Sequence, residues 1–203
     1  MLRIVLVRHG MTHGNTEKRF IGGRTDEPVC QEGQEELCRR EYPEVEKVYT
    51  SPMLRCRQTA CLAFYEEQPD VIEEFRECDF GILEGKNHGE LSGDPVYEAF
   101  LKQGGNAPFP GGESVEEFGV RSFKGFQKVV EDCIRNGYHT AACTVHGGTI
   151  MALLSRLKPE TKNYYDWYVK NGEGYWLELD EKKWQEGVYD AEVLNCFGSR
   201  IYS

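Results

Sequence analysis

The 203-residue chain has no long hydrophobic run. No stretch approaches the roughly 20 consecutive apolar residues that a membrane-spanning helix needs. The apolar run at residues 1–7 reaches Arg8 and His9 too early to be the core of a secretory signal peptide. We therefore expect a protein without a membrane anchor, located in the cytoplasm.

The chain also lacks a run of basic residues. It carries 24 Lys and Arg against 34 Asp and Glu, for a formal net charge of −10. A surface of this sign repels polyanions unless positive charge is segregated on it. Nucleic acid and anionic membrane surfaces are therefore not expected as partners.

Several familiar motifs are missing as well. The eight cysteines are scattered and none forms a C-x-x-C pair, which predicts reduced thiols that pack as small apolar residues. Without H-E-x-x-H or an aspartate cluster, no metal site is expected. The absence of a P-loop, a G-x-G-x-x-G fingerprint and a G-x-S-x-G elbow removes support for ATPases, Rossmann oxidoreductases and serine hydrolases.

Short apolar runs alternate with helical patterns along the chain, and this alternation predicts the fold. The expected strands are 2–7, 47–50, 140–145, 175–179 and 191–195, with a short one at 71–75. The expected helices are 31–40, 51–65 (with Ser51 as N-cap and Pro52 at its first position), 95–102 and 114–137, and one that follows His146-Gly147-Gly148 and runs through Met151 to Leu157. We expect an α/β three-layer sandwich with a mainly parallel central sheet. Residues 1–203 would form one domain, with a small lid insertion at about 86–113.

Two of the expected strands end in the same way, with histidine followed by glycine. His9 and Gly10 follow the first strand, and His146 and Gly147 follow the strand at 140–145. Ligands of parallel sheets bind outside the carboxyl ends of strands, and glycine allows a sharp turn close to a ligand. Either histidine alone could be an ordinary polar residue, but the repeated context favours a shared site.

Arginines accompany both histidines. Arg8 precedes His9, and Arg55 lies near the start of a helix that follows another strand, where amides and the helix dipole favour anions. Arg57 is roughly 200° around that helix and is expected to be a surface charge. The forked donors of arginine match phosphate oxygens, so a phosphate monoester is the simplest ligand.

The ordered motifs resemble the histidine phosphatase superfamily, which includes the phosphoglycerate mutases. The blocks follow the family's order over roughly residues 2–155. They are Leu6-Val7-Arg8-His9-Gly10-Met11-Thr12 with Asn15, Phe20-Ile21-Gly22-Gly23, Ser51-Pro52-Met53-Leu54-Arg55 with Gln58-Thr59-Ala60, Glu77-Cys78-Asp79-Phe80-Gly81 with Glu84-Gly85, Pro110-Gly111-Gly112-Glu113-Ser114, and Val145-His146-Gly147.

The resemblance implies a role for each site residue. His9 would be the nucleophile that forms a phosphohistidine, and Glu77 the proton donor to the leaving group. The residue pattern alone leaves four glutamates as equal candidates for that acid: Glu73, Glu74, Glu77 and Glu84. The remaining roles implied are phosphate binding by Arg8, Asn15, Arg55, His146 and Gly147, and substrate binding by Ile21 and Gly22. No metal or cofactor is implied.

The expected reaction is hydrolysis of small-molecule phosphate monoesters. Mutases of the family usually carry an Arg-Arg pair after the acid, whereas the pair here, Arg39-Arg40, lies on an early helix. The Glu77 block and the Pro110 block look most like bacterial α-ribazole phosphatases of cobalamin assembly. Phosphoglycerate mutase activity is the alternative, and a catalytically inactive phosphate-binding regulatory module is a third reading.

Two groups of aromatic residues have open roles. Tyr97, Phe100 and Phe109 of the lid either select the leaving group or form the lid's own core. A second group lies near the C-terminal end and could belong to the core or to a dimer surface, of which we expect the core. It consists of Tyr164, Tyr165, Trp167, Tyr168, Tyr175 and Trp176. The sequence allows a monomer or a homodimer.

Overall fold

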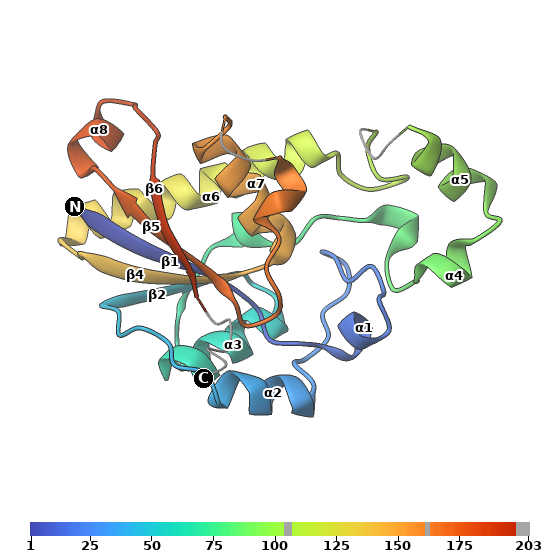
Figure 1. Cartoon of the computed structure of the whole chain (residues 1–203), viewed down its shortest axis with the longest axis horizontal. Coiled ribbons are helices and arrows are strands. Elements are labelled where there is room, and N and C mark those ends of the chain that lie inside the picture. The colour runs from blue at the N-terminus through green and yellow to red at the C-terminus, as the bar shows by residue number, and fades with distance from the viewer. Residues whose placement is uncertain (104–106, 161–162, 198–203) are drawn as a thin grey trace.

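A computed structural model describes residues 1–103, 107–160 and 163–197. Within these ranges one sheet has the strand order β3-β2-β4-β1-β5-β6 (Figure 1). The strands are β1 (Leu2–Arg8), β2 (Lys47–Thr50), β3 (Asp70–Val71), β4 (Thr140–Val145), β5 (Gly174–Leu179) and β6 (Glu192–Phe197). Strands β1 to β4 run parallel, whereas β5 and β6 each run antiparallel to the preceding neighbour. The prediction of a mainly parallel sheet is confirmed.

Helices cover both faces of this sheet. The helices are α1 (His13–Thr16), α2 (Gln31–Cys38), α3 (Leu54–Phe64), α4 (His88–Leu91), α5 (Pro95–Lys102), α6 (Val115–Asn136), α7 (Gly147–Leu157) and α8 (Glu181–Gln185), with 3-10 turns η1 (Glu73–Phe75), η2 (Gly81–Leu83) and η3 (Tyr164–Trp167). Helices α6 and α7 lie on one face, and α2 and α3 lie on the other (Figure 1). The predicted three-layer α/β sandwich is therefore confirmed.

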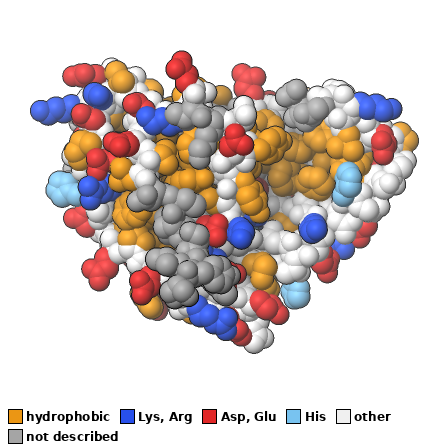
Figure 2. Space-filling model, in the orientation of Figure 1, with side chains coloured by type: hydrophobic (Ala, Val, Ile, Leu, Met, Phe, Trp, Pro, Cys, Tyr) orange, Lys and Arg blue, Asp and Glu red, His pale blue; other side chains and the backbone are white. Residues whose placement is uncertain are grey.

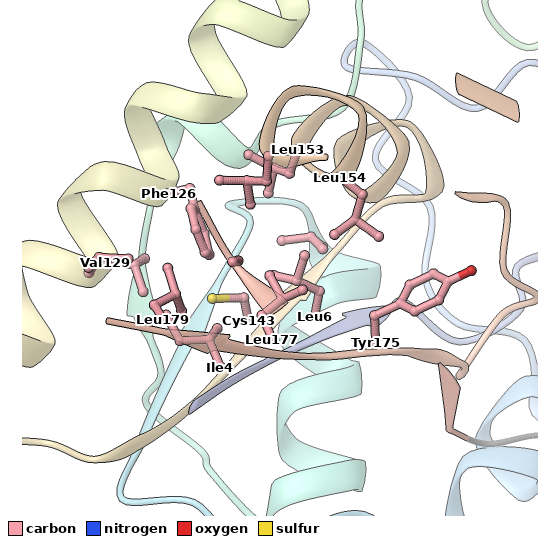
Figure 3. Packing of buried hydrophobic residues seen from close by; sticks show 14 of the residues in the cluster. Ile4, Leu6, Phe126, Val129, Cys143, Leu153, Leu154, Tyr175, Leu177 and Leu179 are labelled. Carbon is pink, nitrogen blue, oxygen red and sulfur yellow. The ribbon is translucent and has the colours of Figure 1, made fainter. Parts of the chain in front are cut away.

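The apolar run of β1 serves both layers. Ile4 and Leu6 belong to the cluster that packs under α6 and α7, with Phe126 and Leu153 among its members (Figure 3). The alternate side chains, such as Val5, pack on the α3 side. A strand that is buried on both faces has a continuous apolar sequence, as this one does.

The start of α3 differs from the prediction. The helix begins at Leu54, with Met53 as N-cap, so the expected cap at Ser51 is wrong. The Ser51 hydroxyl bonds to His146 instead, and the Leu54 N–H donates to the carboxylate of Asp26 at 2.7 Å. A distant carboxylate thus takes the place of the local cap.

Two shorter segments also differ from the expected pattern. The strand expected at 71–75 is limited to Asp70–Val71, after which the chain turns into η1. Residues 11–30, for which the sequence pattern gives no helix or strand, contain α1, whose N-cap Thr12 forms a capping box with Asn15. Both elements are too short to give a periodic apolar signal.

Helices α4 and α5 form an arm that extends away from the sheet, in the region of the predicted lid (Figure 1). Tyr97 and Phe100 are buried in a small cluster with Leu83 and Leu91. These two aromatics are therefore the arm's own core. Residues 104–106 lie outside the described ranges, and the extent of the domain and its lid remains a prediction.

The C-terminal aromatic group is divided between the interior and the surface. Trp167 and Tyr175 are buried in the main core, whereas the side chains of Tyr165 and Tyr168 are 74% and 58% exposed. The expectation of a core role is right for the first pair, holds in part for Tyr164 and Trp176, which are half-buried against smaller clusters, and is wrong for the second pair. The second pair lies at the rim of the cavity described below.

The described cysteine side chains are unpaired thiols, and most of them are buried. Cys196 lies outside the side chains that the structure describes. In the same ranges, no helix has the length and the apolar character that crossing a bilayer requires.

Candidate active site

The sheet register brings the two predicted histidines together. Arg8 pairs with Val145 at the ends of the neighbouring parallel strands β1 and β4. The next residues along each strand are His9 and His146, and their ring centroids lie 5.3 Å apart with an interplanar angle of 65°. The sequence separates these residues by more than half the chain, but the parallel pairing makes them neighbours.

His9 presents one ring nitrogen for chemistry. Its side chain is 3% exposed, and its Nδ1–H donates to the Gly10 carbonyl at 2.8 Å. A carbonyl can only accept, so the neutral ring carries its proton on Nδ1 and keeps the Nε2 lone pair free. Burial lowers the pKa of His9 well below its usual value, and the charges of Arg55 and Arg8 lower it further.

His146 is fully buried and shares a hydrogen bond of 2.7 Å between its Nε2 and the Ser51 hydroxyl. Its Nδ1 lies 4.0 Å from Oε2 of Glu77. Burial lowers the pKa of His146 well below its usual value, and the positive charge of Arg55 lowers it further. The imidazole is therefore neutral, its Nε2 is bonded to the residue that follows β2, and its Nδ1 lies near the Glu77 carboxyl.

Two arginines border the histidines. Arg55 is fully buried and donates from Nη1 to the Thr25 carbonyl at 2.8 Å and from Nη2 to the Gly22 carbonyl at 3.2 Å. Arg8 donates from Nη1 to the Val169 carbonyl at 2.8 Å. The Nε atoms of Arg8 and Arg55 are buried without a hydrogen-bond partner among the described residues. Buried donors of this kind favour an anionic acceptor.

Glu77 is the buried carboxyl of the site. Its Oε1 accepts a hydrogen bond from the Cys78 N–H at 2.9 Å, and the Gly148 N–H also bonds to the carboxyl group. Burial raises the pKa of Glu77, and the opposing effects of these amides and of the arginines are smaller. The carboxyl group is therefore disposed to hold a proton.

The other three glutamates that the sequence offered have different surroundings. Glu73 is exposed and pairs with Arg76, whereas Glu74 pairs with Lys128. Glu84 accepts hydrogen bonds from the loop before α2. None of them lines the cavity that contains Glu77.

The glycines that follow the histidines have a different role from the one expected. Gly10, Gly147 and Gly148 do not adopt positive φ values. Instead they leave no room for a side chain, since a Cβ at Gly148 would lie 2.6 Å from Oε1 of Glu77. At Gly10 a Cβ would lie 2.6 Å from a methyl group of Leu37. Close packing, not a sharp turn, explains these glycines.

A cavity of about 310 Å³ opens over these groups. Of the nine residues expected to have a catalytic or binding role, six line it, namely Arg8, His9, Asn15, Ile21, Glu77 and Gly147. Arg55 and His146 lie behind the lining, where both are completely buried. Gly22 does not line the cavity and contacts the Arg55 guanidinium through its carbonyl. Arg57 is exposed on the surface, as expected.

The cavity has an aromatic wall, and of its members the sequence offered only Phe109 as a possible contact to the leaving group. Hydrophobic side chains gather over the hollow between α7 and the α4–α5 arm (Figure 2). The aromatic residues of the wall are Phe20, Phe80, Phe109, Phe118, Tyr164, Tyr165 and Tyr168. Phe109 alone of the three lid aromatics reaches the cavity. The tyrosine cluster after α7 was the available signal, and we expected it to be core.

Asn171 was also missed. Its Nδ2 donates to the His9 carbonyl and to Oδ1 of Asn15, both at 3.0 Å. It lies 162 residues from His9 and carries no motif, so no sequence spacing connects the two. In the described part of the chain, no group of three or more His, Cys, Asp or Glu side chains is placed to hold a metal ion.

An imidazole with a free nitrogen, two arginines with unpartnered donors and a buried carboxyl group thus lie together at one cavity, an arrangement suited to phosphoryl transfer. The sequence pattern described as "Histidine phosphatase superfamily (branch 1)" matches residues 4–190. The chain belongs to this superfamily. Its relatives include phosphatases and mutases, so the activity falls in one of these two classes.

Three similar proteins illustrate that range. A Hydrogenobacter thermophilus protein named "Putative phosphoserine phosphatase 2" is 34% identical over 167 residues, which cover 77% of this chain and 79% of that protein. A Gloeobacter violaceus 2,3-bisphosphoglycerate-dependent phosphoglycerate mutase is 31% identical over 171 residues, covering 77% of this chain and 76% of that enzyme. The crystal structure of the Shigella flexneri α-ribazole phosphatase superposes with a TM-score of 0.77 at 22% identity, covering 95% of both chains. This last likeness concerns the fold.

Proposed function

We propose that the protein hydrolyses small-molecule phosphate monoesters through a phosphohistidine at His9. The observation that carries this proposal is the free Nε2 of a buried, neutral His9 beside the unpartnered donors of Arg8 and Arg55. A neutral imidazole is nucleophilic, and preorganised donors stabilise charge on the phosphoryl oxygens.

The first step transfers the phosphoryl group to the enzyme. Nε2 of His9 attacks phosphorus in line with the ester oxygen, the P–N bond forms, and the P–O ester bond breaks. Glu77 gives its proton to the departing oxygen, which leaves as an alcohol. The Arg8 and Arg55 guanidiniums hold the phosphoryl oxygens, together with the side chains of Asn15 and His146 and the Gly147 N–H.

The second step releases phosphate. The Glu77 carboxylate takes a proton from water, the water oxygen attacks phosphorus, and the P–N bond breaks. Inorganic phosphate leaves, His9 is neutral again and Glu77 is again protonated. Gly148 supports this exchange because its lack of a side chain lets the carboxyl group lie against the start of α7.

The cavity wall favours an apolar, aromatic leaving group over a carboxylate. The cavity is lined by one arginine besides Arg8, namely Arg19. Arg19 already pairs with the carboxylates of Glu17 at 2.5 Å and Glu90 at 2.6 Å, so its charge is not left for a substrate carboxylate. The Arg39-Arg40 pair forms ion pairs with glutamates of α2. Aromatic side chains stack well on a planar base. A nucleoside-like monoester such as α-ribazole 5′-phosphate is therefore the substrate that we propose, with phosphoglycerate mutase activity as the alternative.

A phosphate-binding regulatory module is the competing proposal from another class. Loss of the nucleophile or of the acid would favour it, yet His9 and Glu77 are both present and buried in the same cavity. A binding module has no need for a carboxyl group whose pKa is raised beside a phosphate site, where it would only add repulsion once ionised.

Trapping of the intermediate tests the reaction. Wild-type protein mixed with radiolabelled p-nitrophenyl phosphate and quenched in alkali should retain an acid-labile label. His9→Ala should retain none and should lose activity by about 1000-fold or more. His139→Ala removes an exposed imidazole at the far end of β4 and should behave as wild type. Activity that survives in His9→Ala would overturn the proposal.

The same wild-type preparation tests the substrate. We expect kcat/KM for α-ribazole 5′-phosphate to exceed the values for phosphoserine and 3-phosphoglycerate by about tenfold or more, since those two place a carboxylate against aromatic rings. Phosphoglycerate is assayed with and without its 2,3-bisphosphate. Interconversion of phosphoglycerates at a comparable rate would favour the mutase.

A further inference from the structure

The segment between η3 and β5 lies against the end of β1. The Gly172 N–H donates to the Arg8 carbonyl, and the Arg8 N–H donates to the Glu173 carbonyl, both at 2.9 Å. The Val169 carbonyl accepts from the Arg8 side chain at 2.8 Å. Three hydrogen bonds to one residue fix the backbone on both sides of Asn171, whose side chain is therefore held at a defined place beside the cavity.

The Asn171 amide group joins two residues of the proposed site. Its Nδ2 has two protons, and two acceptors lie within hydrogen-bond distance, the His9 carbonyl and Oδ1 of Asn15, each at 3.0 Å. Both donors of the side chain are thus committed to the nucleophile's main chain and to the neighbouring amide.

These contacts determine which way the Asn15 amide faces. Its Oδ1 accepts from Asn171 and also from the Thr12 N–H at 3.3 Å, so both lone pairs of this oxygen are occupied. The Nδ2 group is then the end left for the cavity that Asn15 lines. An amide NH₂ can donate to a phosphoryl oxygen, whereas an amide oxygen in the same place would repel it.

We infer that Asn171 is a positioning residue, which acts through Asn15 by holding that amide with its NH₂ toward the phosphate. The inference rests on the proposed function, because it needs an anion in the cavity. It differs from a merely structural role, in which Asn171 would only stabilise the segment before β5 and would affect ligand binding and folding together.

A double-mutant cycle on phosphate affinity distinguishes these roles. Inorganic phosphate is titrated by calorimetry into wild type, Asn15→Ala, Asn171→Ala and the double variant. We expect each single change to weaken binding about tenfold, and the double variant to be within about threefold of Asn15→Ala. Effects of the two single changes that multiply in the double variant would overturn the inference.

Further variants separate positioning from folding. Asn171→Asp keeps the size but turns a carboxylate oxygen toward two acceptors, so it should weaken phosphate binding more than Asn171→Ala does. Asn171→Ser, which removes both amide donors and adds no charge, can replace Asn171→Ala in the cycle if the alanine variant does not fold. Lys170→Ala, an exposed neighbour, should match wild type. A lowered Tm in Asn171→Ala with unchanged phosphate affinity would indicate a structural role and contradict the inference.

Failure of the proposed function would give a different result. If wild-type protein neither binds phosphate nor forms the alkali-stable phosphoenzyme, the phosphoryl-transfer proposal is wrong, and the role of Asn171 is wrong with it. If wild type does both and the cycle is additive, the role of Asn171 alone is wrong.

Discussion

Burial acts on His9 and Glu77 in opposite directions on the pH scale. It lowers the pKa of the imidazole, with help from Arg55 and Arg8, and it raises the pKa of the carboxyl group despite those same arginines. Between about pH 4.3 and 6.5, ordinary histidine and glutamate side chains would both be charged. The shifts extend the neutral form of each group into this interval, and the proposed nucleophile and acid need those forms.

The pH dependence of kcat/KM for an alkyl phosphate follows from these shifts. The rate should rise through the pKa of His9, on the acid side of the ordinary imidazole value, and fall through the raised pKa of Glu77. Glu77→Gln should remove the falling limb and lower kcat/KM by about 10²–10⁴-fold. With p-nitrophenyl phosphate the loss should be much smaller, because nitrophenolate leaves without a proton. Profiles for both substrates over about pH 4–8 measure this.

The matched control is Glu73→Gln, since that side chain is 71% exposed. It should keep both limbs and the wild-type rate. A falling limb that persists in Glu77→Gln belongs to another group, the substrate phosphate included, and would remove the role of acid from Glu77.

At the scale of elements, one loop determines how Arg55 is held. The Gly22 and Thr25 carbonyls of this loop accept hydrogen bonds from the Arg55 guanidinium. The Glu84 carboxylate holds the same loop, by accepting from the Gly22 N–H at 3.1 Å and from the Thr25 hydroxyl at 2.6 Å. It also accepts from the N–H of Arg24. Glu84 therefore contributes to the site through the loop and not as an acid.

Glu84→Ala should weaken both the loop and the site. The substitution leaves the amides of Gly22 and Arg24 and the hydroxyl of Thr25 without this acceptor. Loss of these hydrogen bonds should lower the free energy of unfolding by about 1–3 kcal/mol. The KM for p-nitrophenyl phosphate should rise several-fold, because the Arg55 guanidinium loses its ordered carbonyls. Denaturant unfolding and steady-state kinetics measure the two effects, with the exposed Glu98→Ala of α5 as control. A loss of stability with an unchanged KM would separate the loop from Arg55.

The longer elements were predictable from sequence because their apolar patterns are local. The strand ends at His9 and His146 could be located, and a parallel sheet then implied that they meet. The start of α3 could not be predicted, because its amide is capped by Asp26 from another segment. Asn171 and the tyrosines after α7 were not recognised for a similar reason. Their roles depend on where the chain returns after α7, which no periodicity encodes.

At the scale of the whole molecule, the chain is acidic but its cavity is cationic. The net charge is −10, yet Arg8 and Arg55 lie within interaction distance of His9, and both lower its pKa. Two guanidiniums so close together repel one another, and the buried carboxyl group of Glu77 tends to hold its proton and so offers little compensation. A bound dianion would supply the missing negative charge, so folding and anion binding should be coupled.

Inorganic phosphate should therefore raise the Tm of the protein. A ligand that binds only the folded state at about 100 times its Kd adds about 2.7 kcal/mol, which for a chain of this size corresponds to roughly 5–10 °C. Differential scanning calorimetry with phosphate, against chloride at equal ionic strength, separates specific binding from general screening. Arg55→Met removes the fully buried one of these two charges, so it should abolish most of the phosphate shift while chloride acts on both proteins alike. A shift of the same size in Arg55→Met would mean that phosphate stabilises the fold from elsewhere on its surface.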